Sequence, residues 1–226
     1  MRLALISDVH SNVFALRAAL GKIKEYSPDK LIFLGDLVGG GAYPEETVQL
    51  ARRQSGAIFI KGNHDLFAYT GNSPYRPQDI RSKIIKWQYS VLSDASKEFL
   101  KNMKETETLV GGGKKVVCLH YPKKENGWFK IPVLLPNEDE VEQIFEGMDG
   151  DVFLFGHEHT GSFHVIGDKY YINFGTCGNY VETGLARCGI VDVTSEKVAY
   201  KLINAEYDDE IPKKKAEEIL KILGDK

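Results

Sequence analysis

The nine residues Ala57-Ile58-Phe59-Ile60-Lys61-Gly62-Asn63-His64-Asp65 place a short apolar run just before three polar side chains. The run is rich in β-branched and aromatic residues, which is typical of a buried strand. Gly62 allows the backbone to turn sharply at the strand end, and open α/β sheets bind ligands beyond such ends. Taken alone, the stretch fits an ordinary strand followed by a turn equally well.

The same arrangement recurs four more times, and this recurrence favours a shared site. Each apolar segment ends in aspartate or histidine: residues 2–7 before Asp8-Val9-His10, 31–35 before Asp36, 116–119 before His120, and 152–156 before His157-Glu158-His159. Five of the six histidines lie at these five strand ends. The sixth, His164, fits no motif and is expected on the surface of a hairpin.

Length and composition indicate one domain, residues 1–226, with a sizeable core. The net charge of −3 argues against a nucleic-acid polymer or a membrane surface as partner. Cys118, Cys177 and Cys188 are odd in number and widely spaced, which fits neither a disulfide framework nor a metal knuckle. Cys118 is expected to be a small core residue. We also find no signal peptide and no apolar run long enough to span a membrane, so we expect a cytoplasmic protein.

Helical patterns over residues 12–25 and 44–53 alternate with the first three strands, which predicts a parallel sheet with right-handed crossovers. Residues 66–104, which follow a site strand, form a candidate insert or lid with helices near 79–90 and after Ser93 or Asp94. Residues 121–136 have no clear period and are expected to be a loop. A helix capped by Asn137 follows over 137–145.

The last third of the chain is typical of antiparallel strands. We expect strands over residues 162–166, 169–174, 187–193 and 197–203, with Gly167-Asp168 as a hairpin turn. These strands are expected to form an antiparallel half beside the parallel half. Residues 212–223 are predicted to form a surface helix.

Seven polar residues at the strand ends are suited to metal binding: Asp8, His10, Asp36, Asn63, His120, His157 and His159. Such nitrogen and oxygen donors are preferred by borderline divalent transition metals. Seven is too many for one ion but suits two ions bridged by Asp36. Two ions can clamp the attacking and leaving oxygens of an in-line displacement at phosphorus, with a bridging hydroxide as nucleophile.

These strand ends resemble the motifs of the calcineurin-like metallophosphoesterase family, and most of all its small prokaryotic phosphodiesterase branch. The matching pieces occur in the family's order: Asp8-Val9-His10, Gly35-Asp36 with Gly39 or Gly40, Gly62-Asn63-His64-Asp65, His120, and Gly156-His157-Glu158-His159. The resemblance implies an α/β (α+β) fold, a four-layer α/β-β/α sandwich of two mixed sheets, with a dimetal site at the C-terminal ends of the strands.

The resemblance also implies roles for the residues. Asp8, His10 and His159 would hold one metal, and Asn63, His120 and His157 the other, with Asp36 shared between them. His64 would lie just outside the ligands and stabilise the phosphoryl oxygens or protonate the leaving group. Family members use manganese, iron, zinc or nickel, and the sequence does not choose among them.

Three departures from the family pattern bear on the substrate. Protein Ser/Thr phosphatases carry an arginine after the second aspartate, where this chain has Gly39-Gly40-Gly41, which argues against phosphoprotein substrates. Tyr121 follows His120 where many relatives have glycine, which would narrow the pocket. Gly175-Thr176-Cys177-Gly178 replaces an asparagine-proline-glycine-serine type of turn.

The function expected from the sequence is hydrolysis of a small phosphodiester, nucleotides included, by a metal-bridging hydroxide with the assistance of His64. Asn12, Tyr43 and Arg76 are candidates for substrate contacts. A phosphomonoesterase and a dinucleoside polyphosphate hydrolase remain open within the enzyme class. A non-catalytic scaffold with this fold, such as the retromer scaffold subunit, is the alternative from another class. The oligomeric state stays open.

Overall fold

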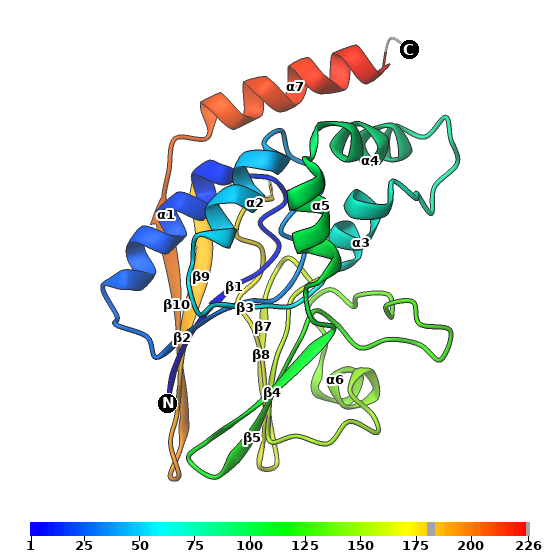
Figure 1. Ribbon diagram of the computed structural model, residues 1–226. Helices are drawn as coiled ribbons and strands as arrows, with labels where there is room; N and C mark the ends of the chain where they lie inside the picture. Colours follow the sequence, from blue (N-terminus) through cyan, green and yellow to red (C-terminus); the bar gives the residue numbers. More distant parts are fainter. Residues whose placement is uncertain (180–183, 225–226) are drawn as a thin grey trace.

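Two five-stranded sheets pack face to face between outer layers of helices, in the computed structural model, which describes residues 1–179 and 184–224 (Figure 1). The strand orders are β10-β9-β1-β2-β3 and β4-β5-β6-β8-β7. This arrangement confirms the expected four-layer sandwich of two mixed sheets.

The first sheet contains three parallel strands and an antiparallel pair. Its strands are β1 (Arg2–Ile6), β2 (Lys30–Phe33), β3 (Ile58–Phe59), β9 (Leu185–Val193) and β10 (Val198–Glu206). The second sheet has parallel β5, β6 and β8 between two antiparallel edge strands. Its strands are β4 (Thr106–Gly111), β5 (Lys114–Leu119), β6 (Val152–Leu154), β7 (Ser162–Ile166) and β8 (Lys169–Asn173).

The prediction of a separate antiparallel half is wrong. The hairpin of β7 and β8 joins the second sheet, where β8 runs parallel to β6 with Phe153 opposite Tyr171. The hairpin of β9 and β10 joins the first sheet, where Leu3 lies opposite Val191. Each hairpin buries an apolar face. The alternation of apolar and polar side chains reveals this face, but it does not indicate which sheet the hairpin joins.

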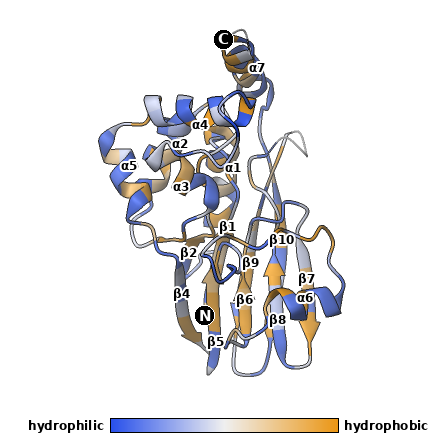
Figure 2. Cartoon of the chain, turned by 90° about the vertical axis from the view of Figure 1, so that its right-hand side faces the viewer, coloured by the Kyte–Doolittle hydropathy of each residue, from blue (hydrophilic) through white to orange (hydrophobic). Residues whose placement is uncertain are grey.

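The core between the sheets is built from buried apolar side chains of both inner faces. Leu3, Leu5 and Ile32 from the first sheet meet Val116, Cys118 and Leu154 from the second. Figure 2 shows hydrophobic residues along the strands of both sheets. Cys118 is buried in this core, as expected.

Helices cover the outer faces of both sheets. The helices are α1 (Val13–Lys24), α2 (Pro44–Arg52), α3 (Asn63–Thr70), α4 (Ile80–Val91), α5 (Asp94–Lys101), α6 (Glu138–Ile144) and α7 (Glu210–Gly224). Leu16 and Ile23 of α1 pack against the first sheet, whereas Val141 and Ile144 of α6 pack against the second. Helix α7 extends along the outside toward α4, where Lys83 Nζ donates to Leu223 O (3.0 Å; Figure 1).

Two elements are absent from the sequence-based prediction. Helix α3 begins with Asn63 and His64, and its short length hides the helical period. Strand β4 is an edge strand, where the partly exposed side chains alternate with exposed ones. The candidate insert, 66–104, contributes Ala68, Leu100 and Met103 to the core on the outer face of the first sheet, and its role as a lid stays a prediction.

Two further features complete the description of the surface. His164 lies in β7 and is half-buried. Within residues 1–179 and 184–224, no helix combines the length and the apolar character needed to cross a membrane.

Candidate metal centre

The polar strand ends of both sheets meet at one edge of the sandwich. Asp8 and His10 follow β1, and Asp36 follows β2. Asn63 and His64 begin α3, just after β3. His120 follows β5, and His157 and His159 follow β6. Because these strands are parallel within each sheet, their C-terminal ends bring the side chains together.

Asp8, His10 and His159 form the first group, in which one ligand atom from each residue lies within 4.8 Å of the others. Asp8 Oδ1 is 3.3 Å from His159 Nε2 and 3.8 Å from His10 Nε2. The two Nε2 atoms face each other at 3.0 Å. Three donor atoms therefore converge on one point.

Asp36, His120 and His157 form the second group, again within 4.8 Å of one another. Asp36 Oδ2 lies 3.5 Å from His120 Nε2, and Asn63 Oδ1 lies 3.2 Å from the same nitrogen. The carboxylate of Asp36 also approaches the first group, with 4.0 Å between Oδ2 and His10 Nε2. A further group within 4.8 Å joins Asp36 to His10 and His64, so Asp36 links the donors of both sets.

In both aspartates, one carboxylate oxygen accepts hydrogen bonds from the protein and the other faces the histidines of the centre. Asp8 Oδ2 accepts hydrogen bonds from Ser7 Oγ (2.5 Å) and the backbone N–H of His157 (3.0 Å). Asp36 Oδ1 accepts from the backbone N–H of His64 (2.8 Å). The remaining oxygen of each side chain, Asp8 Oδ1 and Asp36 Oδ2, points toward the histidines.

His120 is oriented in the same manner. Its Nδ1–H donates to Leu34 O at 2.7 Å, which leaves Nε2 as the nitrogen that can bind a metal once it is deprotonated. A bond of this kind sets the tautomer that a metal-binding histidine needs.

Several non-glycine residues around the centre adopt backbone conformations that are unfavourable for L-amino acids. Asp8, His10, Asp36 and His157 have φ values of 53°, 50°, 51° and 70°, in the left-handed region. A Cβ atom at Gly62 would lie 2.1 Å from Asp36 Oδ1, so only glycine fits there. Strain concentrated in this way is typical of functional sites.

The surroundings of Asp8 Oδ1 indicate whether the centre suits a metal ion. Its side chain is fully buried, and Oδ1 has no hydrogen-bond partner among the described residues. A buried carboxylate oxygen without a partner is costly. A divalent cation would satisfy this oxygen together with the two facing imidazole nitrogens, so the donor set fits such an ion.

Burial and neighbouring charges shift the pKa values of the histidines and of Asp8 in the centre. Burial lowers the pKa of His10 to about 3 and, together with His120, that of His157 to about 4, so both are neutral donors. Burial would lower the pKa of His120 as well, but the carboxylate of Asp36 raises it to about 9. Burial would raise the pKa of Asp8, but the imidazoles of His159 and His120 that face its carboxylate lower it to about 2.

Asp65 and Glu158 are buried carboxylates whose roles the sequence did not reveal. The Asp65 side chain accepts hydrogen bonds from the backbone N–H groups of Val38 (3.2 Å) and Gly62 (2.8 Å), which ties the loop after Asp36 to the start of α3. Glu158 accepts from the N–H groups of Thr160 and Gly161, both at 2.9 Å, and closes the turn that carries His157 and His159. Their position within the motifs, with Asp65 directly after His64 and Glu158 between His157 and His159, was the available signal.

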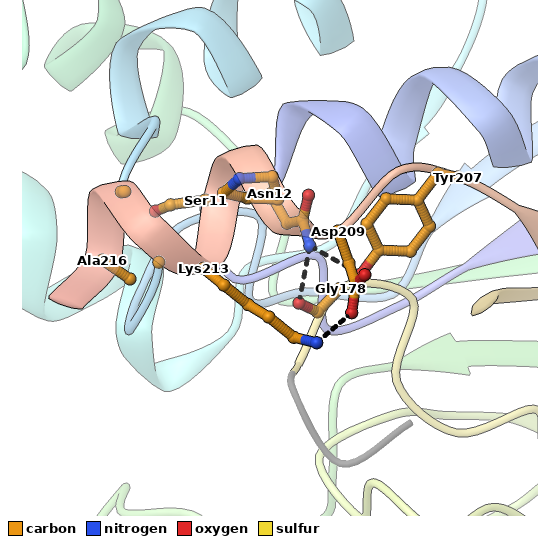
Figure 3. A pocket seen from close by; sticks show the side chains of 10 residues that line it. Ser11, Asn12, Gly178, Tyr207, Asp209, Lys213 and Ala216 are labelled. Atoms are coloured by element: carbon orange, nitrogen blue, oxygen red, sulfur yellow. Dashed lines mark hydrogen bonds and ion pairs between the residues drawn. The ribbon is translucent and has the colours of Figure 1, made fainter. Parts of the chain in front are cut away.

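Asn12 serves as the cap of α1, where Oδ1 accepts from the backbone N–H of Ala15 (3.1 Å). Its Nδ2 donates to Gly178 O and to the hydroxyl of Tyr207, both at 3.0 Å, in a small pocket beside α7 (Figure 3). These bonds give Asn12 a structural role, and its contact with substrate stays a prediction.

The other two candidates for substrate contacts lie in the helical layer. Tyr43 precedes α2, and its ring packs edge-on against Phe14, with 5.3 Å between centroids. Arg76 is exposed on the segment before α4, where its carbonyl accepts from Asp79 N. Their contact with substrate also stays a prediction.

Comparison with known proteins agrees with this geometry. Residues 1–196 match the family model of the calcineurin-like phosphoesterase superfamily domain. The uncharacterised protein MJ0912 of Methanocaldococcus jannaschii is 30% identical over 222 residues, which cover 91% of this chain and 88% of that protein.

Two solved structures share the fold over nearly their whole length. The hypothetical protein PH1004 of Pyrococcus horikoshii OT3 superposes with a TM-score of 0.81 at 20% identity, covering 98% of this chain and 97% of that one. A metallophosphoesterase from Sphaerobacter thermophilus superposes with a TM-score of 0.74 at 23% identity, covering 97% and 94%. With the family match across both sheets and clusters of aspartate and histidine that could hold metal ions, the chain belongs to the calcineurin-like phosphoesterase superfamily.

Proposed function

We propose that this protein is a dinuclear metal-dependent phosphodiesterase that acts on small phosphate esters. The family match supports a hydrolase. The observation that carries the proposal is the set of adjoining ligand groups at the strand ends, which share His10 and Asp36 and include the unsatisfied Asp8 Oδ1.

In this proposal Asp8, His10 and His159 would hold one ion, Asn63, His120 and His157 would hold the other, and Asp36 would serve both. Manganese, iron, zinc and nickel all suit these nitrogen and oxygen donors. When bound, two such ions neutralise charge on the phosphoryl oxygens and make water nucleophilic at neutral pH.

His64 acts on the substrate from beside the ligands. Its ring lies edge-on to that of His10, with 5.2 Å between centroids, and it is half-buried. The backbone N–H of His64 donates to Asp36. Gly39 packs directly against the His64 side chain, and a Cβ atom added to Gly39 would lie only 2.7 Å from His64 Cβ. The imidazole is therefore held where it can donate a proton to the leaving oxygen or a hydrogen bond to a phosphoryl oxygen.

A diester is favoured over a phosphoprotein or other monoester. The loop after Asp36 supplies Gly39, Gly40 and Gly41 in place of an arginine that would hold a phosphate. A monoester carries up to two negative charges at neutral pH and a diester one, so a diester depends less on such a cation.

The test compares two chromogenic esters after removal and return of metal. The chain is treated with EDTA, reconstituted with Mn²⁺, and assayed with bis(p-nitrophenyl) phosphate and p-nitrophenyl phosphate, while bound metal is counted. We expect about two ions per chain, hydrolysis of the diester that needs Mn²⁺, and slower hydrolysis of the monoester. Faster hydrolysis of the monoester would indicate a phosphomonoesterase. Equal, near-zero rates with and without Mn²⁺ would indicate a scaffold.

A further inference from the structure

A short hairpin follows His120 and lies next to the candidate metal centre. Lys123 and Phe129 form an antiparallel bridge, and Gly127 N donates to Lys124 O (2.9 Å) at the turn. Residues 121–136 form the loop that the sequence predicts, and this isolated bridge pairs two of its residues. It fixes the position of two consecutive aromatic residues, Trp128 and Phe129.

The two aromatic residues reach different parts of the centre. The Phe129 ring lies 5.2 Å from that of His120 and 5.7 Å from that of His157, centroid to centroid. The Trp128 ring lies 6.3 Å from that of Phe67, which in turn lies 5.8 Å from His64. The hairpin therefore borders both the candidate ligands and the proposed proton donor.

Trp128 presents an open aromatic surface at this border. It is 52% exposed, whereas Phe67 behind it is 5% exposed. A large apolar ring left open beside a polar site is typical of a ligand contact, because pockets combine such surfaces with a few convergent polar groups.

The hairpin is anchored by Lys123. Its Nζ pairs with Glu105 and lies 4.9 Å from the centroid of Phe129. Ile131, three residues beyond Trp128, is an aliphatic side chain that is 75% exposed and serves as the control position.

We propose that Trp128 is the stacking platform for a planar aromatic group of the ester, so that the substrates are aryl or nucleobase-bearing phosphodiesters. The inference rests on the proposed function and specifies its substrate class. The ring of Trp128 packs on that of Phe67, which places it on the His64 side of the centre. We expect stacking on this ring to strengthen the binding of an aromatic ligand about tenfold.

The experiment measures binding rather than turnover, so that it remains readable if no ester is hydrolysed. Calorimetry with the Mn²⁺-loaded protein compares adenosine monophosphate, phenyl phosphate and methyl phosphate. Trp128→Ala should weaken the two aromatic ligands about tenfold and leave methyl phosphate unchanged. Trp128→Phe, which retains a ring, should restore most of the loss, and Ile131→Ala should resemble the wild type. A tighter fit of adenosine monophosphate than of phenyl phosphate identifies a nucleobase, and equal affinities identify any aryl group.

Fluorescence provides an independent readout because the chain has only two tryptophans, Trp87 and Trp128. In Trp87→Phe, adenosine monophosphate should quench the emission of Trp128, and methyl phosphate should not. The proposal is overturned by equal losses for aromatic and methyl ligands, by no loss at all, or by an equal loss in Ile131→Ala. It is also overturned if Trp128→Ala lowers the oligomeric mass, which would place Trp128 between copies of the chain.

Discussion

At the scale of single residues, the centre depends on how each carboxylate divides its two oxygens. One oxygen of Asp8 and one of Asp36 accept a hydrogen bond from a backbone N–H group, and the other oxygen of each faces histidines. His64 contributes to this arrangement through its backbone, while its ring lies beside the ligands. The ligands and the proposed proton donor should therefore respond differently to substitution.

Asp36→Asn should remove both bound metal and activity, because the shared carboxylate would lose its charge. His64→Ala should keep the metal and lose about 10²- to 10⁴-fold in rate, the usual contribution of a positioned general acid. Metal analysis and diester hydrolysis on the two purified variants distinguish these outcomes. Loss of metal in the histidine variant would contradict the assigned roles.

Metal affinity should rise with pH up to about 9. The charge of Asp36 raises the pKa of His120 to about 9, from 6.5, despite burial. His120 is then protonated in the metal-free protein at neutral pH, and an imidazolium has no lone pair for a metal. Titrations with Mn²⁺ at several pH values across this range should show tighter binding and less proton release as pH increases. Affinity independent of pH would disprove this coupling.

At the scale of elements, the candidate ligands lie on tight turns, and hydrogen bonds to buried carboxylates fix these turns to the neighbouring strands and helices. Asp65 joins the loop after β2 to the start of α3, and Glu158 closes the turn after β6. Helix α6 lies away from the centre and illustrates a purely structural cap. Asn137 Oδ1 accepts from Glu140 N (3.0 Å), and Glu140 Oε2 accepts from Asn137 N (2.8 Å).

Asn137→Ala should lower the free energy of unfolding by about 1 kcal/mol, because the first turn of α6 loses its side-chain cap. The rate of diester hydrolysis should stay unchanged. Asp139→Ala, at an exposed position in the same turn, is the matched control and should change stability by no more than about 0.5 kcal/mol. Urea denaturation of both variants gives the comparison; equal effects would show that the cap contributes nothing specific.

At the scale of the whole molecule, the centre joins the two sheets. Asp8, His10 and Asp36 come from the first sheet, whereas His120 and His157 come from the second. An ion held by donors from both sheets binds the folded chain and not the unfolded one. Its binding free energy is therefore added to the stability of the sandwich.

Mn²⁺ should raise the melting temperature relative to EDTA by about 10–20 °C. A hundredfold excess over the dissociation constant adds about 2.7 kcal/mol for each of the two sites, and a chain of this size gains about 2–4 °C per kcal/mol. Thermal unfolding of His64→Ala should show the same shift, and that of Asp36→Asn a much smaller one. A full shift in Asp36→Asn would mean that the ions bind elsewhere.

The sequence by itself determined most elements and the candidates for the site. Strand and helix patterns are local, so β1, β2, β5 and α1 could be predicted from a few adjacent residues. Seven polar residues at strand ends could be recognised as possible ligands because parallel strands end at one edge.

Only the tertiary structure decided which strands share a sheet and how the side chains of the site face one another. The pairing of Arg2 with Asp192 joins opposite ends of the chain, and a pattern of alternating side chains shows that a face is buried without showing against what. The choice of Asp8 Oδ1 as the unsatisfied oxygen, and the place of Trp128 near His64 through Phe67, likewise depend on contacts between distant segments. Such contacts are set by packing of the whole fold, which no single stretch of sequence contains.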